Sequence, residues 1–172
     1  MTKPFTAIAR WLRRRAEDVA AALLAVMFLA FIVQIVFRYL LNFPIGWTSE
    51  LTVITWLWLV LWGAAFVVTE REEIRFDLIY AAVGSGPRRI MAIITALALL
   101  ALYLFSLPAV FDYVTFMKVQ ASASLKIRFD YLFSIYVIFA VAVIVRYLWI
   151  LWNALRGKAP EDFDPTKAGS GV

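Results

Sequence analysis

The sequence contains neither cysteine nor histidine. The chain therefore cannot form disulfides, use a thiolate as a nucleophile, ligate haem through His or Cys, or build a His-based zinc site. Charged residues are also missing from long stretches, which cover residues 19–37, 51–69, 90–111 and 131–145. The usual catalytic constellations are absent, so we expect neither an enzyme nor a bound cofactor or metal.

Apolar residues are in large excess. Of the 172 residues, 64% are hydrophobic and 16% aromatic, more than a soluble domain of this size can shield from water. The uncharged runs, with the fourth continued past Arg146, are close to the ~20 residues that a helix needs to cross a bilayer. We predict an all-α integral membrane protein with four transmembrane helices, at about 18–41, 48–69, 88–117 and 131–155. Residues 1–157 would form one membrane domain, and residues 158–172 a disordered cytoplasmic tail.

Basic residues gather on one side of the predicted membrane. Twelve precede the first helix, lie between the second and third, or follow the fourth: Lys3, Arg10, Arg13–Arg15, Arg71, Arg75, Arg88, Arg89, Arg156, Lys158 and Lys167. The other side has three or four, so the positive-inside pattern predicts cytoplasmic N and C termini. The pattern also explains the net charge of +5 without a nucleic-acid partner. We expect lipid headgroups to contact Arg13, Arg14, Arg15, Arg88 and Arg89.

Two amphipathic segments flank the predicted spans. Residues 4–17 place apolar side chains on one stripe, which indicates either an interfacial helix on the membrane surface or a helical lead-in to the first span. Phe76, Ile79, Tyr80 and Val83 have helical spacing and predict a second interfacial helix between helices 2 and 3. Arg38-Tyr39 follows the first apolar run where a signal peptide would have a small-residue cleavage site, so we expect that helix to be retained.

The connection between the first two spans carries opposite charges at its ends. Arg38 closes the first helix and Glu50 opens the second, which suggests an ion-paired anchor at the membrane boundary. Capping of the exposed amides by Thr48 or Ser49, with Glu50 at the positive end of the helix dipole, is the alternative. Gln34 lies one turn before Arg38 and is expected to bond another helix. Trp47 would belong to the interfacial aromatic belt.

Two further sets of residues are candidates for contacts with other proteins. Trp58 and Trp62 share a face of the second helix, and Gly63 begins a small-residue patch where another helix could approach closely. The third connection carries Lys118, Lys126 and Arg128. These three could contact another protein, or could be ordinary solvated loop charges.

The acidic residues all lie at or beyond the ends of the predicted helices. A transporter that works alone usually has ionisable groups at mid-membrane or broken helices in two matching repeats, and neither is present here. The sequence therefore favours a scaffold. The alternative is a self-sufficient homo-oligomeric exporter or channel, which would need an intramembrane carboxylate.

Several motifs in order resemble a known family. They are Phe37-Arg38-Tyr39, Pro44–Leu51, Trp62-Gly63-Ala64-Ala65, and Arg71 with Glu73–Leu78. Together they resemble the small (Q-type) permease subunit of tripartite ATP-independent periplasmic (TRAP) transporters, over about residues 18–155. The resemblance implies a bacterial inner-membrane subunit that braces a large, elevator-type permease subunit. It also implies that the large subunit carries an organic acid with sodium, after a periplasmic substrate-binding protein delivers the acid. Under this resemblance, Lys118, Lys126 and Arg128 are expected to help dock that binding protein.

Overall fold

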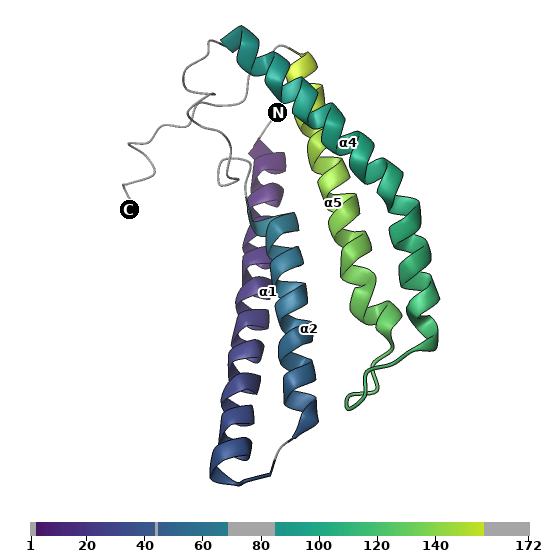
Figure 1. The fold of residues 1–172 in the computed structure, drawn as a ribbon. Coiled ribbons are helices and arrows are strands. Elements are labelled where there is room, and N and C mark those ends of the chain that lie inside the picture. The colour runs from purple at the N-terminus through teal and green to yellow at the C-terminus, as the bar shows by residue number, and fades with distance from the viewer. Residues whose placement is uncertain (1–2, 44, 69–84, 157–172) are drawn as a thin grey trace. The chain divides into compact units, whose positions relative to one another are not determined.

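The computed structural model describes residues 3–43, 45–68 and 85–156. Within these ranges the chain forms four long helices: α1 (Lys3–Ile35), α2 (Gly46–Trp62), α4 (Ser85–Phe116) and α5 (Phe129–Leu155) (Figure 1). Short turns of other helix types extend three of them: the π-helical η1 (Val36–Leu40) after α1, the π-helical η2 (Gly63–Val67) after α2, and the 3₁₀ turn η3 (Met117–Val119) after α4. The predicted all-α class is confirmed.

The helices have the length and the exposed apolar surface of membrane spans. Among the described residues, four segments are long and apolar enough to cross a membrane: Arg10–Leu40, Gly46–Val67, Arg89–Val119 and Phe129–Leu155. Large apolar side chains on them remain uncovered by the chain itself, with Phe28 60% exposed and Phe105 89% exposed. Such side chains are favourable only where hydrocarbon replaces water. The protein is therefore a multi-pass membrane protein, as its composition predicts.

The structure describes only part of the segments that flank the predicted spans. Residues 4–17 are helical and continuous with the first span, because α1 begins at Lys3. A position at the membrane surface for this part of α1 remains a prediction. The predicted helix at 76–83 and the tail at 158–172 lie outside the described residues. Helix α4 continues through Pro108, although proline removes one backbone donor.

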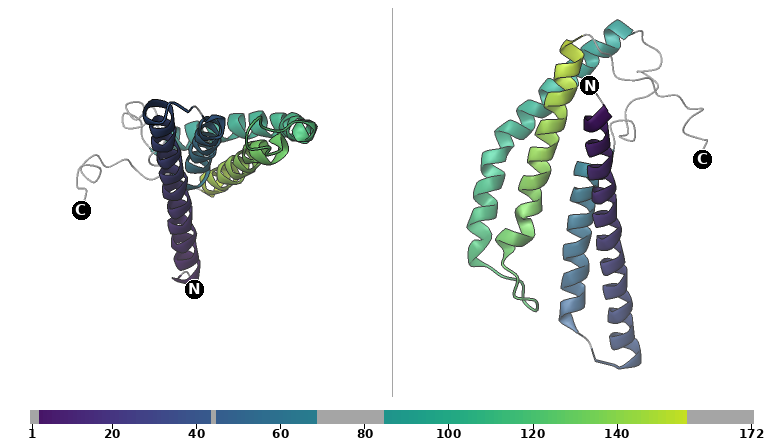
Figure 2. Two further views of the ribbon diagram at one scale, coloured as in Figure 1. Left: turned by 90° about the horizontal axis from the view of Figure 1, so that it is seen from below. Right: turned by 180° about the vertical axis from the view of Figure 1, so that it is seen from behind.

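The chain divides into two compact units. The first comprises Met1–Val68 with Leu107–Ala142, and the second comprises Thr69–Ser106 with Val143–Val172. In the first unit, α1 and α2 run side by side, as both views in Figure 2 show. Small side chains are buried in this unit, including Ala16, Ala30, Thr55 and Ala65. Small residues let helix backbones approach closely, which is how helices gain contact energy in a membrane.

Aromatic and small side chains link α4 and α5. In the first unit, the rings of Tyr113 on α4 and Phe133 on α5 lie 6.2 Å apart, and Ile135 is fully buried. In the second unit, Ala92, Ala96 and Leu100 form a buried stripe along α4 with helical spacing. The Tyr113–Phe133 contact lies near the end of α4 and the start of α5, beside the connection that contains the candidate site.

Candidate functional site

A tight hairpin connects α4 to α5. Ala121 and Arg128 form an isolated antiparallel bridge. The Ser122 amide donates to the Ile127 carbonyl at 2.9 Å, and the Ile127 amide donates back to the Ser122 hydroxyl at 3.2 Å. The Phe129 amide donates to the Gln120 carbonyl at 3.0 Å. Lys126 has a φ of 56°, the left-handed conformation that reverses the chain. The hairpin, residues 120–129, is thus well defined despite its short length.

The carboxylate of Glu50 holds the tip of this hairpin. Its Oε1 accepts the Ser124 amide at 2.8 Å, and its Oε2 accepts the Leu125 amide at 3.0 Å. One side chain in the first turns of α2 therefore satisfies two consecutive backbone donors that are far away in sequence. Bonds to an ionised acceptor are shorter and stronger than bonds between neutral groups.

The start of α2 approaches the hairpin closely. A Cβ on Gly46 would lie 2.8 Å from the Ser124 hydroxyl oxygen, so the missing side chain is what allows this contact. Thr48, in the same turn, is fully buried and donates to the Ile45 carbonyl at 3.2 Å. Gly46, Thr48 and Glu50, together with the hairpin tip, form one packed junction.

The interpretation of Ser or Thr as the helix cap is wrong in detail. The N-cap residue of α2 is Ile45, and it makes no side-chain cap bond. The hydroxyl of Thr48 donates to a backbone carbonyl, and Ser49 does the same to the Gly46 carbonyl at 2.8 Å. Both residues follow the helix start, so their hydroxyls bond backward instead of capping the amides.

The structure does not bring Arg38 and Glu50 together as an ion pair. Both oxygens of Glu50 are occupied by hairpin amides, and no described carboxylate pairs with Arg38. Arg38 lies in the η1 turn with an exposed side chain, and Gln34 is half-buried one turn earlier. The two charges share an end of adjacent helices, as predicted, but the hairpin takes the carboxylate. The ion-paired anchor is therefore a wrong prediction.

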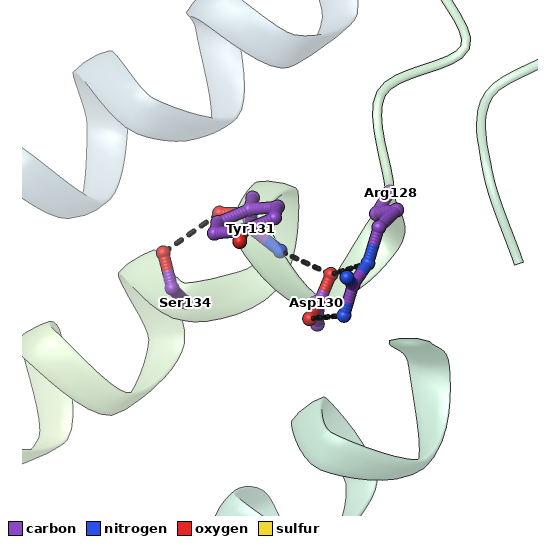
Figure 3. Close-up of polar contacts among 4 residues, drawn as sticks. All are labelled: Arg128, Asp130, Tyr131 and Ser134. Atoms are coloured by element: carbon purple, nitrogen blue, oxygen red, sulfur yellow. Dashed lines mark hydrogen bonds and ion pairs between the residues drawn. The ribbon is translucent and has the colours of Figure 1, made fainter. Parts of the chain in front are cut away.

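Arg128 is only partly available for docking. Its guanidinium binds Asp130 through both oxygens, at 3.2 Å and 2.6 Å, and stacks over the Tyr131 ring at 5.3 Å (Figure 3). Asp130 also accepts the Tyr131 amide at 3.0 Å at the start of α5. Lys118 and Lys126 are exposed. The two lysines and the Arg128–Asp130 pair therefore carry the charge of this end of the chain.

The sequence matches the model of a known protein family. The model described as "Tripartite ATP-independent periplasmic transporters, DctQ component" matches residues 27–157, about three quarters of the chain. The chain belongs to the DctQ family. No curated protein gives a significant match. DctQ is a family of transporter components and not of enzymes, and such a component works beside a large permease and a periplasmic binding protein. The resemblance read from the motifs is confirmed.

Two indoles of this DctQ chain tie helices together. Trp58 Nε1 donates to the Leu132 carbonyl of α5 at 3.0 Å, and Trp62 Nε1 donates to the Ala16 carbonyl of α1 at 3.1 Å. Both side chains are half-buried, whereas Trp47 is 41% exposed. The indole N–H groups of Trp58 and Trp62 are thus used within the chain. A Cβ on Gly63 would meet nothing within 4 Å, so the chain itself leaves space there.

The basic residues expected at lipid headgroups have varied surroundings in the DctQ chain. Arg89 donates to the Ala154 carbonyl at 2.6 Å and to the Leu155 carbonyl at 2.9 Å, at the end of α5. Arg13 pairs with Glu17 and Arg15 with Asp18, both as exposed pairs on α1. Arg14 is exposed, and Arg88 lies in the first turns of α4. Headgroup contact for these residues remains a prediction.

Sequence reasoning missed the partners of Glu50 and Arg89 for a common reason. Both side chains bind backbone groups, namely the amides of Ser124 and Leu125 and the carbonyls of Ala154 and Leu155. A backbone partner has no residue type, so no pattern in the sequence identifies it. Gly46 was the one available signal, since a glycine beside a helix start can mark a close approach. Within the described ranges, no three acidic side chains gather closely enough to hold a metal ion.

Proposed function

We propose that this chain is the non-catalytic scaffold subunit of a TRAP-type secondary transporter in the bacterial inner membrane. It braces the large elevator-type permease subunit, which imports an organic acid, a carboxylate, with a cation gradient. Both termini face the cytoplasm. The observation that carries the proposal is the family match over residues 27–157, joined to four spans whose central parts hold no carboxylate.

The hydroxyl and indole groups of α2 and α5 support a bracing role. The hydroxyls of Thr52 and Thr55 donate to carbonyls of their own helix, and so does that of Ser134. The indoles of Trp58 and Trp62 donate to backbone carbonyls of neighbouring helices. Moving an organic anion through lipid needs ionisable or unpaired polar groups along a path. Groups already committed to backbone bonds hold helices in place instead.

Reconstitution of the subunits tests the proposal. Proteoliposomes receive the large permease with this chain, the large permease alone, or this chain alone, each with the binding protein and a cation gradient. We expect uptake of a carboxylate substrate only in the first sample, because the moving part of the large subunit would otherwise lack a fixed brace. Full uptake by the large permease alone would contradict the scaffold role. Uptake by this chain alone would support the homo-oligomeric transporter instead.

We further propose that the exposed lysines near the hairpin receive the binding protein. Lys118, in the η3 turn after α4, and Lys126, on the hairpin, are exposed, and Arg128 follows on the same hairpin, where Asp130 pairs with it. An acidic patch on a soluble partner would be attracted to this group and oriented by it. The rigid hairpin suits docking because its charges keep fixed positions.

Neutralising the two lysines tests the docking surface. We expect Lys118→Gln with Lys126→Gln to weaken docking of the binding protein about threefold to tenfold at low salt, and to flatten its salt dependence. The matched control is Arg14→Gln, an exposed arginine on α1. Affinity is measured by biolayer interferometry on the assembled membrane complex. Docking that is insensitive to salt in the unsubstituted complex would rule out the electrostatic surface.

A further inference from the structure

The end of α1 carries polar groups that the described chain leaves unused. Arg38 is exposed and pairs with no described carboxylate. Gln34, one turn deeper in the same helix, is half-buried and has no hydrogen-bond partner among the described residues. Guanidinium offers five donors in a planar fork that matches phosphate geometry. Unpaired donors in lipid are costly, so a ligand outside the chain is expected to satisfy them.

The same end also presents acceptors. The π-helical turn η1 closes with the Leu41 amide on the Val36 carbonyl at 3.2 Å and the Phe43 amide on the Phe37 carbonyl at 2.9 Å. No described amide donates to the carbonyls of residues 38–40. These groups form the negative end of the helix dipole. The helix end therefore favours a cationic donor, and the side chain of Arg38 in the same turn favours an anion.

Apolar side chains continue the surface toward the middle of the span. Phe28, Phe31 and Ile35 lie one to three turns before Arg38 and are 60%, 50% and 37% exposed. At the boundary itself, Tyr39 is 74% exposed, as expected for an aromatic residue at headgroup level. The order along α1 is thus apolar surface, one amide, one guanidinium and then open carbonyls.

We propose that this end of α1 is a binding site for a phospholipid with a zwitterionic phosphoethanolamine headgroup. Arg38 donates to the phosphate, and the open carbonyls of η1 accept hydrogen bonds from the primary ammonium. Gln34 donates to an ester carbonyl of the same lipid, one turn deeper. The acyl chains lie on Phe31, Ile35 and Phe28. A carboxylate from a partner helix would satisfy Arg38 but would leave the η1 carbonyls without a donor, so the lipid accounts for more of the groups.

Headgroup chemistry makes the proposal testable on the unsubstituted protein. The full chain, stripped of co-purified lipid in detergent, is titrated in native mass spectrometry with lipids of matched acyl chains. We expect phosphatidylethanolamine to bind at least about fivefold more tightly than phosphatidylcholine, whose trimethylated nitrogen cannot donate hydrogen bonds, and than phosphatidylglycerol, which has no ammonium. Binding should fall stepwise as the nitrogen is methylated. Equal binding of the ethanolamine and choline lipids would overturn the proposal.

Substitutions test whether Arg38 is part of the site, and a competitor tests whether the ligand is a whole lipid. Arg38→Gln should weaken the binding of every phospholipid tested, because it removes the donor to the shared phosphate, whereas Arg14→Gln, at an exposed arginine elsewhere on α1, should leave binding unchanged. Soluble phosphoethanolamine at the same concentration should not compete, because it lacks the acyl chains, and full competition would overturn the lipid assignment. If Arg38→Gln keeps the full affinity for phosphatidylethanolamine but loses co-purification with the large permease, Arg38 binds a protein carboxylate and the proposal is wrong. The lipid measurement needs no partner subunit, so it can fail or succeed independently of the scaffold role.

Discussion

Replacing Glu50 with alanine should release the tip of the 120–129 hairpin while the four helices stay formed. The carboxylate is the acceptor for the amides of Ser124 and Leu125, at 2.8 Å and 3.0 Å, and alanine leaves both amides without it. We expect the exchange of these amides with solvent deuterium to become at least about tenfold faster, since exchange follows local opening. Peptides that cover residues 90–105 in α4 should exchange as before.

Two variants make the Glu50 experiment specific. Glu50→Gln keeps the size of the side chain but puts an amide donor where one backbone donor must be accepted, so it should loosen the hairpin nearly as much as alanine. Glu17→Ala is the matched control, because Glu17 forms an exposed pair with Arg13 on α1. That pair is worth little in water. Unchanged exchange of residues 120–128 in Glu50→Ala would show that the carboxylate does not hold the hairpin.

The Glu50 variants also show whether docking of the binding protein depends on the positions of the two lysines or only on their charges. Lys118 and Lys126 keep their charges in Glu50→Gln, while the hairpin that carries Lys126 loses its support. If docking needs the lysines in fixed places, affinity for the binding protein falls with the hairpin and not with the net charge. Glu50 would then be a positioning residue, acting through the amides of the hairpin tip.

The four spans were predictable from the sequence because a segment in hydrocarbon is required to hydrogen-bond its own backbone amides and carbonyls along its whole length. A run without charge from residue 19 to 37 has few ways to meet that requirement other than a helix. Residues 4–17 were expected to be helical, and α1 begins at Lys3 and runs on into the span without a break, because Pro4 lies in the first turn, where proline is tolerated. The family could also be inferred, because motif order and helix spacing survive in the linear chain.

The partner of Glu50 could not be predicted in the same way. Opposite charges at adjacent helix ends favoured Arg38, and electrostatics alone gave no reason to prefer backbone amides 74 residues away. What decides the pairing is tertiary: α2 and the hairpin meet where Gly46 leaves room, and the turn at Ser124 and Leu125 points two amides at one carboxylate. Arg38 was consequently left for a ligand outside the chain.

The second large effect is expected at Arg89. Its guanidinium donates to the carbonyls of Ala154 and Leu155, which as part of the last turn of α5 lack intrahelical donors. Ala154 is only 2% exposed, so water cannot easily replace the arginine there. Hydrogen bonds from a charged donor contribute more than neutral ones, and the positive charge also favours the C-terminal end of the helix dipole. We expect Arg89→Ala to lower the free energy of unfolding by about 2–3 kcal/mol.

Comparison of substitutions at Arg89 shows whether geometry or charge matters. Arg89→Lys keeps the charge but has no planar fork to reach two carbonyls at once, so it should recover only about half of the loss. Arg14→Ala removes the same charge at an exposed site and should change the free energy of unfolding by less than about 0.5 kcal/mol. The measurement is unfolding in mixed detergent micelles with increasing dodecyl sulfate, followed by circular dichroism. If Arg89→Ala is no more destabilising than Arg14→Ala, the end of α5 does not depend on Arg89, and headgroup contact becomes the better account of that residue.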